Sequence, residues 1–307
     1  MGSIRVTPRL LVDRILHNLS AQTRSILNLQ EQLSTGQKVN RPSDNPLAAR
    51  RAVAAQTIIA QNDQYLANIT AMRPHLSETE SSVLTVVDTL QRARELALTG
   101  SSTTNSQLQR DQIATEVNQL LESVLAEGNH ITNGRYIFGG TRTLNRPFVE
   151  TRDAAEEIVS VAYEGNDEQF RIEVSEGIRL PGNETGRTVF QQTSASTADI
   201  FQSLIDLRDN LRAGNINALE TRLDEFNRAQ DQLLVSTARL GTVQKRLDQT
   251  ESKLEDISVQ MQQVVSDNID ADFAEVMVNL NSQTNAYQAA LNASARVIQP
   301  SLLDYIR

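Results

Sequence analysis

Histidine side chains are the first residues in this sequence to test as metal ligands. The chain contains three of them, His17, His75 and His130, and no two are close enough to form a His-x-x-x-His pair. A helical zinc site needs two such ligands on one face. We therefore expect no metal at these positions and interpret the histidines as residues on helix surfaces.

An acidic cluster is the second candidate for metal binding. Asp267, Asp270, Asp272 and Glu275 lie within nine residues of one another. An EF-hand loop needs a glycine at its sixth position and a glutamate at its twelfth, and neither is present at that spacing. The cluster is more typical of a solvated hinge than of a calcium site.

Residue types that support catalysis are also missing. The chain has no cysteine, which excludes disulfides, thiolate metal sites and cysteine nucleophiles. It contains no GxSxG, P-loop or GxGxxG motif, and Gly139 and Gly140 are typical of a turn. We expect no enzyme activity and no cofactor.

Charge and hydropathy exclude two classes of partner. The 38 acidic residues exceed the 29 basic ones, which gives a net charge of −9, whereas binding to nucleic acid or to an anionic membrane surface needs a basic face. The densest basic patch has no interleaved aromatic residues and is expected to form ion pairs with an acidic segment; it comprises Lys38, Arg41, Arg50 and Arg51. No apolar run exceeds four residues, so we expect no transmembrane helix and no secretory signal.

The helical segments near the two ends of the chain each carry an apolar seam with heptad spacing. The first seam comprises Val12, Ile15, Leu19, Ile26, Leu29 and Leu33. The second comprises Phe273, Val276, Leu280, Tyr287, Leu291, Ile298 and Leu302. A pair of short helices buries too little surface to offset its ordering entropy. We therefore predict that the two seams pack against each other and against other subunits, and that they form an assembly interface.

Two long periodic segments lie between these ends. One runs from Asn45 and Pro46, a typical N-cap and first helical residue, to about Leu98; Pro74 inside it should kink or break the helix. The other runs from about 217 to 265. Shorter helices at about 106–132 and 199–211 complete a bundle. Since only 4% of the residues are aromatic, we expect a core with few aromatic side chains.

The apolar period changes in the middle of the chain. Phe170, Ile172 and Val174 alternate with polar residues, and the turn residues Gly165 and Asn166 precede them. The predicted fold is mainly α, a bundle of long helices with paired terminal helices and a small β-rich insertion. We predict three domains: residues 1–44 with 268–307, residues 45–135 with 198–267, and residues 136–197.

Polar breaks separate the terminal helices from the bundle and predict an interdomain elbow. Its residues are Lys38, Asn40, Arg41, Pro42, Asp44, Asp267, Asp270 and Asp272. A further hypothesis pairs Lys38 and Arg41 with the three C-terminal aspartates. Each such pair would contribute only about 0–1 kcal/mol if exposed.

Both ends of the chain resemble the flagellin superfamily. Residues 33–49, LSTGQKVNRPSDNPLAA, are similar to its N-terminal signature, and residues 272–294 with 302–306 are similar to its C-terminal signature. Within that superfamily the chain looks more like the hook–filament junction members than like filament flagellins. Three features carry this resemblance: the prolines Pro42 and Pro46, the segment NGRYIFGGT at residues 133–141, and the short β insertion.

The resemblance implies a flagellin-type helical fold and a structural subunit without enzyme activity. Such a subunit forms a ring at the distal end of the bacterial flagellar hook. The implied partners are copies of itself, the preceding hook-associated protein, flagellin and an export chaperone. The resemblance also implies export through the flagellar type III apparatus without a cleaved signal peptide, and hence an extracellular location in the flagellum. A filament flagellin with a short outer domain, or a stand-alone coiled-coil interaction protein, remains an alternative.

Overall fold

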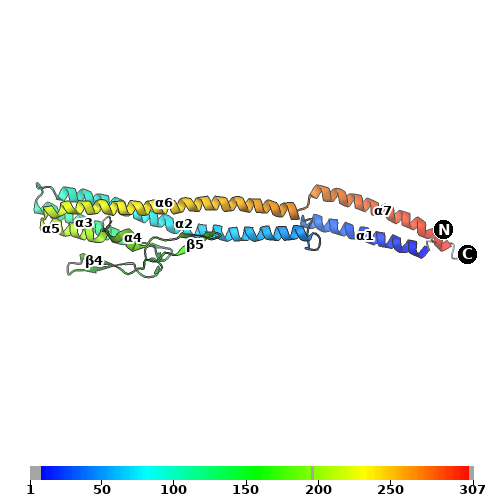
Figure 1. Cartoon of the computed structure of the whole chain (residues 1–307), viewed down its shortest axis with the longest axis horizontal. Helices are drawn as coiled ribbons and strands as arrows, with labels where there is room; N and C mark the ends of the chain where they lie inside the picture. Colours follow the sequence, from blue (N-terminus) through cyan, green and yellow to red (C-terminus); the bar gives the residue numbers. More distant parts are fainter. Residues whose placement is uncertain (1–7, 195–196, 304–307) are drawn as a thin grey trace. The chain divides into compact units, whose positions relative to one another are not determined.

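The computed structural model of the chain describes residues 8–194 and 197–303, and helices dominate it (Figure 1). Six helices are long enough to pack along a seam: α1 (Pro8–Thr35), α2 (Pro46–Gly100), α3 (Gln107–Gly128), α5 (Ile200–Ala213), α6 (Ile216–Ile269) and α7 (Phe273–Leu303). A short helix, α4 (Gly186–Phe190), precedes α5. The prediction of a mainly α fold with long helices is confirmed. Among the described residues, no helix is long and apolar enough to cross a membrane.

Eight short strands lie between α3 and α5 and form four antiparallel two-stranded sheets. They are β1 (Ile131–Thr132) with β2 (Arg135–Tyr136), β3 (Phe148–Arg152) with β4 (Ile158–Tyr163), β5 (Arg171–Ser175) with β6 (Ile178–Pro181), and β7 (Gln191–Ser194) with β8 (Thr197–Asp199). The predicted β-rich insertion is therefore present as a series of hairpins. Each hairpin is too small to be stable alone and depends on packing against the helices.

Two helices differ from the predicted pattern. Helix α3 ends at Gly128, and the residues after it form the β1–β2 hairpin, whose turn residues Asn133 and Gly134 have φ values of 52° and 74°. Positive φ at both central residues matches the right-handed twist of the strands. Helix α2 continues through Pro74 and is not broken there, because packing along its apolar face outweighs the loss of one main-chain hydrogen bond.

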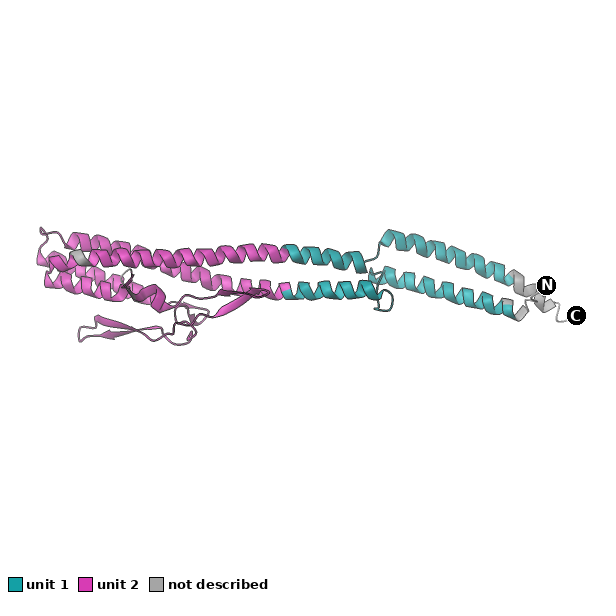
Figure 2. Cartoon of the chain, in the orientation of Figure 1, with its two compact units in different colours: residues 1–61, 256–307 teal, residues 62–255 magenta. Residues whose placement is uncertain are grey.

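The chain divides into two compact units, coloured separately in Figure 2. Unit 1 comprises residues 1–61 and 256–307, and unit 2 comprises residues 62–255. The boundaries fall inside α2 and α6, while the β hairpins lie within unit 2. The division into three domains, with limits near residues 44, 136, 197 and 268, stays a prediction.

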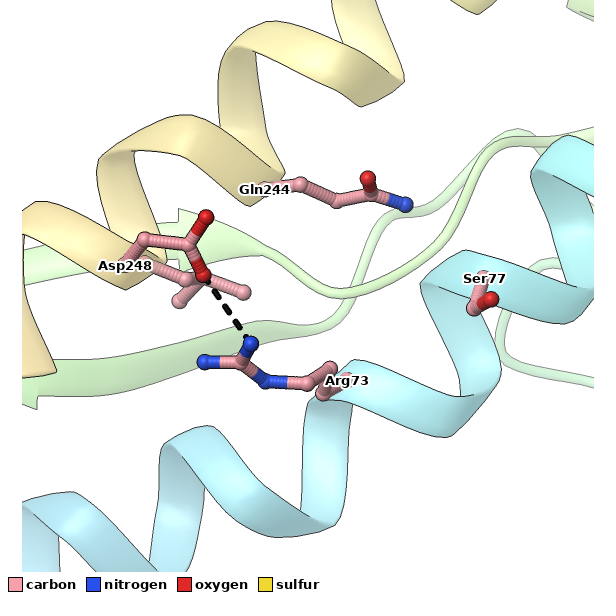
Figure 3. A pocket seen from close by; sticks show the side chains of 5 residues that line it. Arg73, Ser77, Gln244 and Asp248 are labelled. Carbon is pink, nitrogen blue, oxygen red and sulfur yellow. Dashed lines mark ion pairs between the residues drawn. The ribbon is translucent and has the colours of Figure 1, made fainter.

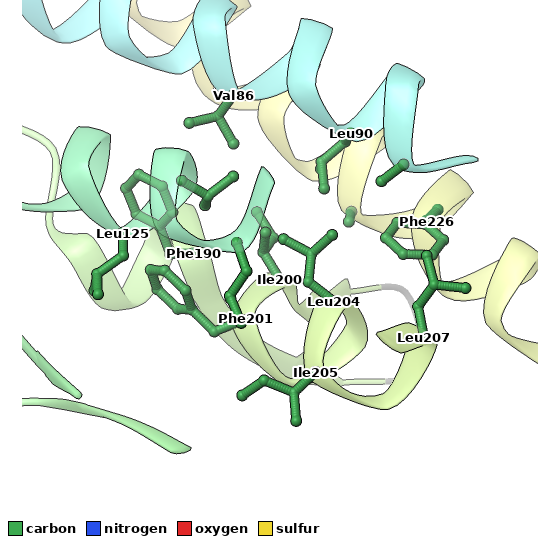
Figure 4. Close-up of a cluster of buried hydrophobic side chains, with 14 of the residues drawn as sticks. Val86, Leu90, Leu125, Phe190, Ile200, Phe201, Leu204, Ile205, Leu207 and Phe226 are labelled. Atoms are coloured by element: carbon green, nitrogen blue, oxygen red, sulfur yellow. The ribbon is translucent and has the colours of Figure 1, made fainter. Parts of the chain in front are cut away.

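Unit 2 contains a core that is richer in aromatic side chains than the composition suggests (Figure 4). Helices α2, α3, α5 and α6 enclose it, and the phenylalanines Phe138, Phe148, Phe190, Phe201 and Phe226 are all buried there. The ring centroid of Phe148 lies 5.0 Å from that of Phe201 and 5.2 Å from that of Phe190. The expectation of a core with few aromatics therefore fails locally, because the segment between α3 and α5 brings Phe138, Phe148 and Phe190 to one place.

Unit 1 contains α1 and α7, which lie side by side and run in opposite directions (Figure 1). The end of α1 and the start of α7 meet at a short antiparallel bridge between Gln37 and Asp270. The first turns of α2 and the last turns of α6 complete the unit.

Candidate functional site

The histidines and acidic residues form no metal centre within the described residues: no group of three or more His, Cys, Asp or Glu side chains could hold an ion there. His17 is exposed on α1. His130 follows the end of α3, and its Nε2 atom lies 2.9 Å from Glu78 Oε1. His75 is half-buried on α2, so two of the three histidines are not the simple surface residues that the sequence predicts.

A small cavity of about 210 Å³ lies in unit 2 between α2 and α6 (Figure 3). Arg73 Nη1 lies 3.0 Å from Asp248 Oδ1 across this cavity, and Arg73 also pairs with Glu251. On the same side of α6, Gln244 Nε2 donates to Glu80 Oε2 at 2.8 Å. These contacts satisfy one another, so the cavity is interpreted as a polar clamp between two helices rather than as a catalytic site.

The predicted seam of α1 is only half-buried by the pairing with α7. All six of its residues have intermediate exposure: Val12, Ile15, Leu19, Ile26, Leu29 and Leu33. Polar Gln22 lies within the seam, and it lines a shallow cavity of about 330 Å³ with Leu19 of α1 and Ala290 of α7. One partner helix therefore leaves part of this apolar surface in contact with water.

The predicted seam of α7 is divided between buried and exposed positions. Val276 is 7% exposed, and Leu280 and Tyr287 are half-buried. Phe273 is 62% exposed and Leu291 is 42% exposed. The other two predicted seam residues, Ile298 and Leu302, lie outside the described side chains.

Further exposed apolar residues of α1 and α7 were missed from the sequence, among them Leu16, Leu27 and Met277. Met277 follows Phe273 by one helical turn on α7, and Leu16 and Leu27 lie eleven residues apart, or three turns, on α1. Spacings of four and eleven residues place side chains on one face of a helix, so they indicate a second apolar stripe. This stripe is overlooked when only the heptad positions are counted. We call these three residues, together with the exposed Phe273 and Leu291 of α7, the open apolar face.

Main-chain hydrogen bonds hold the elbow in unit 1. Lys38 N–H donates to the Ile269 carbonyl at 2.7 Å, and Ala271 N–H donates to the Gly36 carbonyl at 2.9 Å. Gly36 has φ of +71°, a conformation in which most other residues would be strained. These two bonds join the loop after α1 to the loop before α7.

Side chains at the elbow pair differently from the sequence-based hypothesis. Lys38 Nζ donates to the main-chain carbonyl of Asp267 at 2.7 Å. Arg41 Nη2 lies 3.5 Å from Oε1 of Glu31 on α1. The predicted ion pairs of Lys38 and Arg41 with Asp267, Asp270 or Asp272 are thus replaced by these contacts, because the last turn of α6 presents a main-chain carbonyl to the lysine.

The remaining elbow residues cap or tighten the local backbone. Asp44 Oδ2 accepts from the N–H groups of Asn40 at 3.2 Å and Arg41 at 2.8 Å. Asp272 Oδ1 accepts from Ala274 N–H at 2.9 Å and caps the start of α7. Pro42 lies exposed in the intervening turn. The elbow residues are therefore brought together as backbone supports.

Two protein-family matches cover the N-terminal and the C-terminal parts of the chain. Residues 12–143 match the bacterial flagellin N-terminal helical region, and residues 223–306 match the bacterial flagellin C-terminal helical region. Together these regions span more than two thirds of the chain.

Two curated relatives are similar over nearly their whole length. Flagellar hook-associated protein 3 of Escherichia coli (strain K12) is 27% identical over 311 residues, which covers 94% of this chain and 96% of that protein. Flagellar hook-associated protein 3 of Salmonella typhimurium (strain LT2) is 25% identical over 312 residues, with 95% of both chains covered.

Solved structures share the fold. A putative flagellar hook-associated protein from Vibrio parahaemolyticus superposes with a TM-score of 0.65 at 19% identity and covers 74% of this chain and 100% of its own. The flagellar junction protein FlgL from Legionella pneumophila gives a TM-score of 0.62 at 15% identity, with 72% and 100% covered.

Proposed function

The chain belongs to the bacterial flagellin family, and we propose that it is the structural subunit that joins the flagellar hook to the filament. The observation that carries this proposal is the match, over nearly the full length of both chains, to two proteins named flagellar hook-associated protein 3. A filament flagellin with a short outer domain is disfavoured because neither of those relatives bears that name.

The proposed mechanism is mechanical. Copies of the chain form a ring, and the open apolar face of one copy packs against its neighbours, while the elbow keeps α1 and α7 in register. At about 25 cal/mol per Å² of apolar area removed from water, a few hundred Å² per contact stabilises the ring by several kcal/mol before entropy is subtracted. Closed symmetry repeats the same contact around the ring.

The proposal includes partners and a route. The chain acts without enzyme activity, binds the preceding hook-associated protein on one side and flagellin on the other, and leaves the cell through the flagellar type III apparatus with the help of an export chaperone. Support for these partners comes from the family and from the relatives' names. The half-buried seams support self-association.

A deletion strain tests the proposal. Without this chain, cells should keep their hooks, lack attached filaments and release flagellin into the medium, and the wild-type gene should restore filaments. Electron microscopy counts hooks and filaments, and immunoblotting measures flagellin in the medium. Filaments that stay attached to hooks would overturn the junction role, and cells that release no flagellin would favour the filament subunit instead.

A further inference from the structure

A cavity in unit 2 lies outside the elements to which the junction role is assigned. Unit 2 contains a half-open cavity of about 430 Å³, which lies within the size range of small-molecule sites. Helix α2, the β1–β2 hairpin, the loop after β2 and strand β5 with the residue before it contribute its walls. Its apolar lining consists of Ala71, Met72, Pro74, Phe170 and Ile172.

Two buried polar atoms of this cavity lack a hydrogen-bond partner within the described chain. They are His75 Nε2 and Thr132 Oγ1, and both residues line the cavity. A buried polar atom without a partner destabilises the fold. Both atoms lie behind the wall of the cavity and are closed off from solvent, so they show that the wall is imperfectly packed and are not groups that a bound molecule reaches.

The ionisable groups that line the cavity favour an anion. Arg135 is exposed there, and its Nη1 atom donates to Thr143 Oγ1 at 3.0 Å, which holds the guanidinium in place. None of the described residues that line the cavity is a carboxylate, although the chain as a whole has a net charge of −9. A guanidinium beside neutral walls is a good partner for a carboxylate.

The rings in the wall favour a flat ligand. The centroids of His75 and Phe170 lie 5.7 Å apart and their planes are inclined by 55°. Met72 adds a polarisable sulfur, which packs well against aromatic rings. Burial lowers the pKa of His75, because desolvation disfavours the charged imidazolium.

We propose that this cavity binds a small aromatic carboxylate, with the ring against Met72 and Phe170 and the carboxylate at Arg135. The site lies in unit 2, whereas the open apolar face lies in unit 1. The proposal therefore does not depend on the junction role.

Titration calorimetry on the full-length protein tests this site, with indole-3-acetate as the probe. Indole lacks the carboxylate, hexanoate lacks the ring, and N-acetylphenylalaninamide imitates the side chain of a partner protein. We expect saturable binding of indole-3-acetate at least about tenfold tighter than that of the other three. No saturation up to about 10 mM, or equal or tighter binding of any of the three, would overturn the proposal.

Variants locate the binding in the cavity. Arg135→Ala should weaken the binding of indole-3-acetate at least about tenfold. Ala71 lines the cavity at an exposed position, and Ala71→Trp should block that binding. The matched control is Arg142→Ala, because Arg142 is an exposed arginine of the loop after β2 that does not line the cavity. Circular dichroism checks that each variant is folded. Unchanged binding by Arg135→Ala, or an equal loss in Arg142→Ala, would contradict the assignment.

Discussion

Arg208 is a charged residue with almost no access to solvent: its side chain is 2% exposed. Its Nη1 atom donates to Asn118 Oδ1 and to the Ile158 carbonyl, both at 2.9 Å, and Nε donates to Asp209 Oδ1 at 2.8 Å. One guanidinium therefore ties α5 to α3 and to strand β4. Burying a charged group lowers the stability of the fold, but breaking up its buried interactions lowers that stability further.

We predict that Arg208→Met lowers the free energy of unfolding by about 2–4 kcal/mol, because it leaves the Ile158 carbonyl buried without this donor and Asn118 Oδ1 without its partner. Urea denaturation of the purified chain measures this change. Arg246→Met, on an exposed face of α6, serves as the control and should change the stability by no more than about 0.5 kcal/mol. Equal effects of the two substitutions would contradict the role of Arg208.

A second prediction concerns the pH dependence that His75 contributes. Burial lowers the pKa of His75 below its ordinary value of 6.5, so the unfolded chain takes up the proton first as the pH falls. Stability is fully present above pH 6.5 and decreases as the pH falls below it. His75→Phe should therefore lose less stability than the unsubstituted chain between pH 7.5 and 5.5. The shift in the midpoint of urea denaturation over this range measures the loss.

The control for this effect is His17→Phe, since His17 is exposed on α1. Its pH dependence should follow that of the unsubstituted chain. If His75→Phe and the unsubstituted chain lose the same stability over that range, burial of the imidazole is not the cause.

At the scale of the element, α7 carries both buried and exposed apolar residues, and the two kinds should respond differently to substitution. Val276→Ala should lower the protection of α1 and α7 against amide hydrogen exchange, because Val276 is 7% exposed and its methyl groups hold the pair together. Phe273→Ala should leave that protection unchanged in the isolated chain, because Phe273 is 62% exposed. In cells, however, Phe273→Ala should reduce the number of attached filaments. A loss of exchange protection in Phe273→Ala would show that this residue supports the fold instead.

Helices and their apolar faces were predictable from the sequence because spacing alone reports them. The helices α1 and α7 were predicted, and so was the start of α2 at Pro46, whereas the assignment of their seams to an assembly interface stays a prediction. The end of α3 was placed too late, since the residues of the β1–β2 hairpin continue an apolar pattern. Helix α3 already ends at Gly128, and the positive φ values of Asn133 and Gly134 belong to the hairpin turn that follows.

Features that depend on distant contacts were not predictable. The partners of Lys38 and Arg41 could not be chosen from charge alone, because a main-chain carbonyl competes with carboxylates for a lysine. The clustering of Phe138, Phe148, Phe190 and Phe201 required knowledge of how the hairpins fold back on the helices. The cavity around His75 likewise combines segments from α2 to β5, and the histidine looked like a surface residue when α2 was considered alone.

For the whole molecule, we predict that limited proteolysis of the isolated chain removes both ends and leaves a resistant fragment near residues 45–265. The seams of α1 and α7 are only partly covered, and elements with few buried contacts open most easily. Mass spectrometry of a trypsin time course identifies the fragments. In assembled flagella the same bonds should resist cleavage. An isolated chain that stays intact as long as the fragment would contradict the proposed dependence on assembly.

The elbow bridge has a consequence for how the chain reaches its native state. Lys38 and Asp267 are 229 positions apart along the backbone, so closing this loop carries one of the larger entropic costs in the molecule. Contacts of such high sequence separation form late. During synthesis, α1 therefore has no α7 to pack against until nearly all of the protein has been made. That delay favours a loosely folded state, which is the state able to pass through a narrow channel.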